Sequence, residues 1–350
     1  MKNLQQSAAS IKEHHSIPKI SLYLIFIGLP LVLFILSLTL GRYQIGPIDV
    51  LKVMLSPIFP SIAEGIPDIA QQLILRVRLP RILAALLIGA SYGATGTAFQ
   101  AIFKNPLVDS NILGVTSGAG FGAALALLFF GDPWLVQASA FVFGLVAVFL
   151  SFFGSRLYRT SPLLILTLMG ILVGSFFGSL TSLLKYAADP LDSLPAITFW
   201  LLGSLTGITW QNLLPLLILT ILGLIYLWII RWRLNILSLG DPEASALGVD
   251  PTRMKLGIIL FSTLMTAVAV SVSGVIGWVG LVIPHAGRMI VGPEHKRLLP
   301  VSISLGAAFL MIIDDLARSL LPGEIPLGVL TGLIGVPILV LLMRRSRTGW

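Results

Sequence analysis

Apolar runs of about 20 residues recur along almost the whole chain, and short polar segments with turn residues separate them. A helix of about 20 apolar residues spans a hydrocarbon core of about 30 Å. Lipid satisfies no backbone hydrogen bond, so such runs form helices. The pattern predicts an all-α polytopic membrane protein with about ten transmembrane helices. The spans lie near residues 20–41, 80–101, 112–130, 135–155, 162–184, 211–230, 255–274, 276–291, 299–318 and 326–343.

The segments outside this pattern define the expected organisation. Residues 42–79 mix polar and apolar positions and contain four prolines, so they are too interrupted to span. The polar residues 1–19 are expected to form a cytoplasmic N-terminal tail. The ten-helix membrane domain then covers residues 20–343, and residues 344–350 form a cytoplasmic C-terminal tail. The first apolar run exceeds the usual length of a signal-peptide core, which favours a retained span.

Composition supports a lipid-facing surface. Of the 350 residues, 56% are hydrophobic and 11% are charged, whereas soluble domains carry about 25% charged residues. The absence of cysteine excludes disulfides and thiolate metal sites. The net charge of +8 could indicate a nucleic acid or a membrane surface as partner. Its distribution favours membrane lipid, and no nucleic-acid partner is expected.

Lys and Arg placement predicts the orientation. With the N-terminus in the cytoplasm, ten spans return the C-terminus there, and 16 of the 23 basic residues fall inside. The exception is an external cluster of Arg76, Arg78 and Arg81. Either the first loop is misplaced, or the cluster is a docking site for an acidic partner.

A weak internal repeat is visible at an offset of 178 residues. The topology would make the two copies inverted, an arrangement that is frequent in transporters. Three coincidences among abundant residue types leave the repeat open. The pairs are Gly96 with Gly274, Pro106 with Pro284, and Gly114 with Gly292.

Signatures of catalysis and of ion coupling are scarce. The chain has no Walker A pattern, no metal-binding His or Cys cluster and no catalytic nucleophile motif. Acidic groups within spans mark ion pathways, and only Asp314 and Asp315 lie near the end of one. Pairing with Arg318 is favoured over a proton relay. Transport energy is therefore expected to come from another subunit.

Residues 234–254 form the longest ordered-looking cytoplasmic insert. Gly240 and Pro242 predict a turn, a short helical stretch follows, and Asp250 precedes a restart at Pro251. A pair of short helices parallel to the membrane would give a partner a rigid handle. An ordinary amphipathic loop fits the pattern equally well.

Four blocks of sequence carry a family resemblance over nearly the whole chain after residue 20. They closely resemble permease subunits of the iron-siderophore, haem and cobalamin class of ABC importers, the FecCD family. The blocks are RLPRILAALLIGASYGATGTAFQAIFKNPLVDSNILGVTSGAG (78–120), LGDPEASALGVD (239–250), SGVIGWVGLVIPHAGRMIVGPEHKRLLP (273–300) and DDLARSLLPGEIPLGVLTGLIGVPILVLLMRR (314–345).

The resemblance implies a cobalamin-permease-like fold of ten helices and a homodimer around a central path. It also implies two ATP-hydrolysing subunits below and an external substrate-binding protein above. The chain would be a transport subunit without a cofactor of its own, with ATP and Mg bound by the partner ATPase. The expected location is the cytoplasmic (inner) membrane of a prokaryote.

The resemblance also assigns residues to three sites. Arg78, Arg81 and Arg318 would contact glutamates of the binding protein as exposed pairs, which suits the planar guanidinium. The ATPase-coupling residues would be Asp241, Glu243, Ala244, Leu247, Gly248 and Asp250. The cytoplasmic gate would be Asn105, Leu107, Thr160 and Ser161. For Asn105, capping of a helix before Pro106 is an alternative.

The predicted function is ATP-driven import by alternating access, with a ferric siderophore as the expected cargo. Haem, cobalamin or an oxyanion are alternatives with the same architecture. The rival hypotheses are an ion-coupled secondary transporter, which the inverted repeat alone would allow, and a membrane anchor without transport activity.

Overall fold

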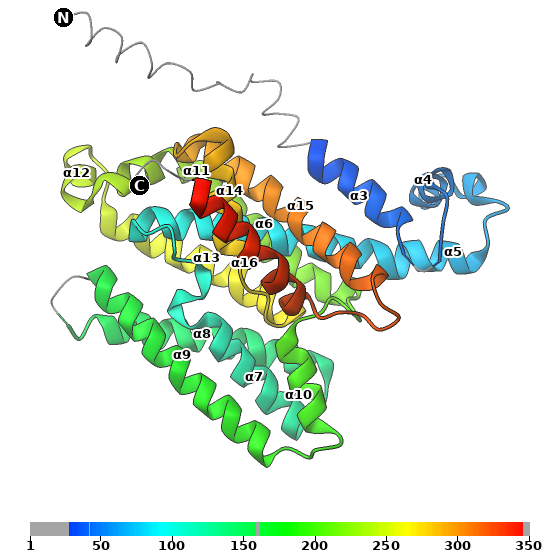
Figure 1. The fold of residues 1–350 in the computed structure, drawn as a ribbon, viewed down its shortest axis with the longest axis horizontal. Helices are drawn as coiled ribbons and strands as arrows, with labels where there is room; N and C mark the ends of the chain where they lie inside the picture. The colour runs from blue at the N-terminus through cyan, green and yellow to red at the C-terminus, as the bar shows by residue number, and fades with distance from the viewer. Residues whose placement is uncertain (1–27, 42, 159–161, 346–350) are drawn as a thin grey trace, which may run out of the picture.

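The computed structural model describes residues 28–41, 43–158 and 162–345, and helices joined by loops make up this part of the chain (Figure 1). The longer helices are α3 (Leu29–Thr39), α6 (Leu79–Phe103), α7 (Val115–Phe129), α8 (Pro133–Ser155), α9 (Pro162–Ala187), α11 (Trp210–Leu239), α13 (Pro251–Ser273), α14 (Val279–Val291), α15 (His295–Ser319) and α16 (Leu327–Arg345). The shorter elements are α4 (Pro47–Leu55), η2 (Pro60–Ala63), α5 (Asp68–Gln72), η3 (Leu73–Arg78), η4 (Ser110–Leu113), α10 (Ser193–Leu202) and α12 (Asp241–Ala246).

Each of the ten predicted spans coincides with one of the longer helices, which confirms the all-α polytopic fold. Among the described residues, six helices are long and apolar enough to cross a membrane, namely α8, α9, α11, α13, α15 and α16. The first predicted span is represented by α3, because residues 20–27 lie outside the described part. The segment 42–79 forms only short helices, as its prolines predict.

Helix α6 is the centre of the molecule. Nearly all of its residues are buried, and α15 is its most extensive packing partner. Glycines make this close approach possible, because a Cβ atom at Gly89 would collide with the carbonyl oxygen of Gly306, and one at Gly93 with that of Ser302. Small residues serve the same purpose at helix interfaces in membranes generally, where backbones approach closely.

Helices α6 to α9 and α13 to α16 share an order of long, short, long and long, but the residue pairs of the predicted repeat do not match. Helices α6 to α9 have 25, 15, 23 and 26 residues, and α13 to α16 have 23, 13, 25 and 19. At the offset of 178 residues, however, Gly96 lies inside α6 whereas Gly274 follows the end of α13. Pro106 lies in a loop, whereas Pro284 is inside α14. These residue pairs do not occupy equivalent positions.

The two ends of the molecule carry different short elements (Figure 1). Helices α4 and α5 lie at one end of the long axis, and α12 lies at the other. The insert around α12 is shorter than predicted, because α11 continues to Leu239 and α13 begins at Pro251. The expected second short helix is therefore the first turn of α13. Helix α10, between the predicted fifth and sixth spans, was not predicted.

Candidate functional site

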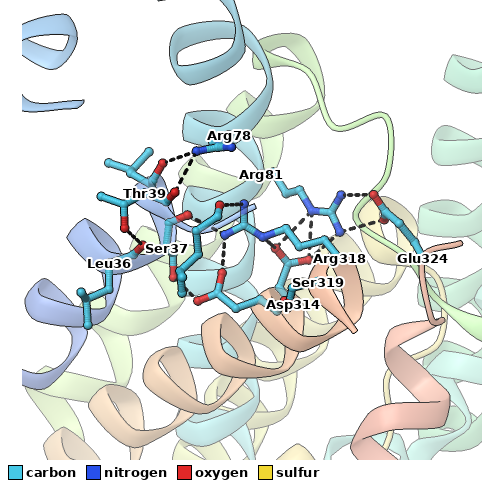
Figure 2. A network of polar contacts seen from close by, with 12 residues as sticks. Leu36, Ser37, Thr39, Arg78, Arg81, Asp314, Arg318, Ser319 and Glu324 are labelled. Atoms are coloured by element: carbon cyan, nitrogen blue, oxygen red, sulfur yellow. Dashed lines mark hydrogen bonds and ion pairs between the residues drawn. The ribbon is translucent and has the colours of Figure 1, made fainter. Parts of the chain in front are cut away.

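Arg81 lies in the first turn of α6, between two carboxylates that are both more than 200 residues away from it in the sequence (Figure 2). Its Nε lies 3.0 Å from Oδ1 of Asp314, and its Nη2 lies 2.9 Å from the same oxygen. Nη1 and Nη2 also donate to the two oxygens of Glu324, at 2.8 and 2.9 Å. The Asp314 side chain is 1% exposed and that of Glu324 is 33% exposed. Arg81 therefore joins α15 to the loop before α16.

Arg318 ties α3 to the end of α15. Its guanidinium contacts the carboxylate of Asp315 and donates to the backbone carbonyls of Ser37, at 2.6 Å, and Leu40, at 3.0 Å. The Ser37 hydroxyl donates to the other oxygen of Asp315 at 2.6 Å. Arg318 thus pairs with the acidic doublet as predicted, although the closest partner of Asp314 is Arg81.

Arg78 completes this arginine network, which we define as Arg78, Arg81 and Arg318. Its Nη1 donates to the carbonyl oxygen of Leu38 at 2.7 Å, and its Nη2 to that of Tyr43. The three residues are 4%, 8% and 8% exposed, so they are not the exposed surface cations that the sequence suggested. Arg76, by contrast, is exposed. The docking role of the network stays a prediction.

Helix α12 is held firmly at the opposite end of the molecule. Lys255 of α13 donates to both oxygens of Asp241, at 2.6 and 2.7 Å. Asp250 caps α13 by accepting from the backbone N–H of Arg253 at 3.1 Å. The ammonium group of Lys104 donates to the Leu239 carbonyl at 3.0 Å. The insert is thereby fixed to the ends of α6 and α13.

The predicted coupling residues divide into inward and outward side chains. Ala244 is fully buried, whereas Glu243 is exposed and Leu247 is 61% exposed. Gly248 has a φ of +77°, which favours glycine because a Cβ atom is strained there. An exposed leucine beside a sharp turn can insert into a partner, so the outward side of α12 suits an ATPase contact. These roles stay predictions.

The predicted gate begins where α6 ends. Lys104 adopts a left-handed conformation with a φ of 51°, and Oδ1 of Asn105 accepts from the N–H of Leu107 at 2.9 Å. Asn105 therefore shapes the turn around Pro106. The helix cap itself is Lys104, so the capping role considered for Asn105 is not seen, and Leu107 remains exposed. Thr160 and Ser161 lie outside the described residues, so their position relative to Asn105 stays a prediction.

Sequence reasoning missed three polar contacts. Glu324 lies in the loop before α16, and in the sequence only the nearby Gly323 and Pro326 indicated a turn there. Gln100 accepts from Arg288 inside the helical bundle. Asn235 accepts from the backbone N–H of His295 at 2.7 Å. In the described ranges, no group of three His, Cys, Asp or Glu side chains is placed to hold a metal ion.

Comparison with known proteins gives consistent matches. The FecCD transport family matches residues 29–345. The molybdate import system permease protein MolB of Haemophilus influenzae is 40% identical over 328 residues, which cover 93% of this chain and 96% of that protein. The hemin transport system permease protein HmuU of Yersinia pestis is 38% identical over 283 residues, covering 78% and 83% of the two chains.

A solved structure gives the same result for the fold. It is described as "An inward-facing conformation of a putative metal-chelate type ABC transporter". The superposition has a TM-score of 0.83 at 39% sequence identity and covers 94% of this chain and 100% of that one.

Proposed function

Because the chain belongs to the FecCD transport family of ABC importer permeases, we propose that two copies form a homodimer around a central translocation path. As a permease of this kind the chain is a non-catalytic, multi-pass membrane subunit. A partner ATPase hydrolyses ATP, and a substrate-binding protein is the other partner. Both termini, including residues 1–19 and 344–350, are proposed to lie in the cytoplasm.

The observation that supports the transport proposal most directly is that α6 runs from the arginine network to the insert around α12, which are the candidate contacts for the binding protein and the ATPase. Its first turn holds Arg81 in the arginine network, and the residue after its last turn, Lys104, binds the carbonyl of Leu239 just before α12. Nearly all residues of α6 are buried, so we expect it to move together with the helices that it packs against. ATPase closure at α12 would thus be transmitted to the outer end.

We place the binding protein at the α4 and α5 end and the ATPase at the α12 end. Arg81 is the best candidate for an external contact because its partner Glu324 is partly exposed. A carboxylate of the binding protein can replace Glu324 on the outer edge of the guanidinium while Asp314 keeps the inner edge. Docking would then exchange one carboxylate for another on Arg81, so the buried guanidinium stays paired while the partly exposed Glu324 turns to solvent.

For the cargo, we propose a ferric siderophore, with molybdate as the second candidate. The first agrees with the metal-chelate description of the solved relative. The second is supported by the molybdate permease, which matches 93% of this chain. Both cargoes are delivered by a binding protein, so the permease itself needs few cargo-specific groups.

Reconstitution tests the proposal. Proteoliposomes containing the permease, its ATPase and its binding protein should take up either radiolabelled ferric siderophore or radiolabelled molybdate only when ATP is supplied. Uptake that proceeds without ATP but follows a proton or sodium gradient would overturn the proposal in favour of a secondary transporter. A complex that assembles but moves no cargo would favour the anchoring subunit.

A further inference from the structure

A pocket of ≈ 310 Å³ lies where α11 meets the start of α15. Helix α11 contributes Trp228, Ile229, Arg231 and Trp232, and α15 contributes Lys296. The pocket therefore combines two cations from different helices with two indole rings and one aliphatic side chain. This composition differs from that of a groove between apolar spans, and the function proposed above does not use it.

Tryptophan positions along α11 place the pocket at a membrane boundary. Trp210 begins the helix, and Trp228 and Trp232 follow 18 and 22 residues later. At a rise of about 1.5 Å per residue these separations are about 27 and 33 Å, which matches a hydrocarbon core of about 30 Å. Tryptophan is enriched at both interfaces. Arg231 thus lies at headgroup depth, on the α12 side of the membrane.

Arg231 and Lys296, the two cations of the pocket, differ from nearby basic residues because those residues form ion pairs with carboxylates. Arg297 forms an ion pair with Glu294, Arg253 with Asp250, and Lys255 with Asp241. Within the described ranges, neither Arg231 nor Lys296 has a carboxylate partner. The Arg231 guanidinium instead lies over the ring of Trp228, at 4.1 Å from its centroid. Two positive charges thus converge on one pocket without a compensating anion from the described residues.

We propose that this pocket binds the headgroup of an anionic phospholipid. Its phosphate would lie between Arg231 and Lys296, and its acyl chains would follow Ile229, which is 65% exposed, toward the membrane centre. Basic pockets between transmembrane helices bind anionic headgroups by this combination of charge and apolar contact. The ligand is a component of the bilayer, distinct from the transported cargo.

The position of the pocket at the membrane boundary favours a lipid over the ATPase as its ligand. Helix α11 continues for eight residues beyond Arg231 to Leu239, which corresponds to about 12 Å. Helix α12 lies beyond that point, so a soluble subunit bound at α12 contacts the chain further from the membrane. Trp232 and Ile229 are both exposed beside the cations, as expected for side chains that face the lipid interface rather than water.

Native mass spectrometry of the full-length permease provides the test. The protein is purified from nanodiscs that contain phosphatidylcholine and phosphatidylglycerol, and the retained lipids are counted. The wild type should retain phosphatidylglycerol selectively. Arg231→Gln and Lys296→Gln should each lower this retention about fivefold, the factor expected for one basic residue near an anionic surface. Arg231→Lys keeps the charge and should retain most of the binding.

Arg297→Gln is the matched control, because Arg297 is adjacent to Lys296 but is exposed and paired with Glu294. It should leave retention unchanged. An equal loss in this variant would overturn the proposal in favour of general surface charge. Equal retention of phosphatidylcholine would overturn it in favour of apolar contact alone. Displacement of the lipid by millimolar inorganic phosphate would indicate a free-anion site instead. Displacement by the ATPase would indicate a protein interface.

Discussion

Arg81 and Asp314 form a buried ion pair in which two guanidinium nitrogens share one carboxylate oxygen, at 3.0 and 2.9 Å. The pair joins the first turn of α6 to α15, the two helices that pack most extensively in the molecule. A charge buried without a partner is very costly, so each member of such a pair is needed to compensate the other. Glu324 occupies the remaining edge of the same guanidinium from a more exposed position.

We predict that Asp314→Asn destabilises the fold far more than Glu324→Gln. Removal of one partner from a buried ion pair costs about 3–5 kcal/mol. The pair with Glu324 is partly exposed, so its loss should lie closer to the value of about 0–1 kcal/mol for surface pairs. The measurement is the thermal midpoint of unfolding of the purified permease in detergent, detected by intrinsic tryptophan fluorescence. Equal shifts in the two variants would contradict the assigned difference in burial.

A second prediction concerns docking of the binding protein. Glu324→Gln removes the internal carboxylate that competes for Arg81, so the binding protein should associate up to about fivefold more tightly, the factor for a pair worth about 1 kcal/mol. Affinity is measured on the nanodisc-embedded permease–ATPase complex, and the gain should shrink at high salt. The control is Glu64→Gln, an exposed carboxylate near α5. Weaker docking after Glu324→Gln would contradict the proposal that a carboxylate of the binding protein replaces Glu324 on Arg81.

The fold could largely be predicted from the sequence because hydrophobic length is a local property. Each span carries its own signal, and the ten predicted spans all correspond to helices. Helix α10 was missed because its ten residues are too few to span a membrane. The burial of Arg81 was missed for a different reason, since its partners lie 233 and 243 residues away. The sequence indicated an unusual basic cluster but not the acidic groups that neutralise it.

A third prediction tests the coupling region. Leu247 is 61% exposed beside the turn at Gly248, and its truncation in Leu247→Ala should reduce ATPase co-purification and transport-coupled ATP hydrolysis without lowering the thermal midpoint. Leu320→Ala is the control, because Leu320 is 56% exposed at the end of α15 away from α12 and undergoes the same truncation. If Leu247→Ala leaves ATPase binding unchanged, the outward side of α12 is not the contact.

The last prediction concerns the contact between α6 and α15. Glycine-to-alanine changes inside a helix normally favour the helix by about 1 kcal/mol. Gly178→Ala in α9 should follow this rule, because a Cβ atom there meets nothing within 4 Å.

Gly93→Ala should do the opposite, because its Cβ atom would collide with the backbone carbonyl of Ser302, which cannot move aside as a flexible side chain can. The two helices would have to separate, and the ion pair between Arg81 and Asp314 spans the same interface. We therefore expect Gly93→Ala to lower the yield of folded protein and its thermal midpoint, while Gly178→Ala leaves both unchanged or raised. Similar behaviour of the two variants would show that the α6–α15 contact is more adaptable than its backbone packing implies.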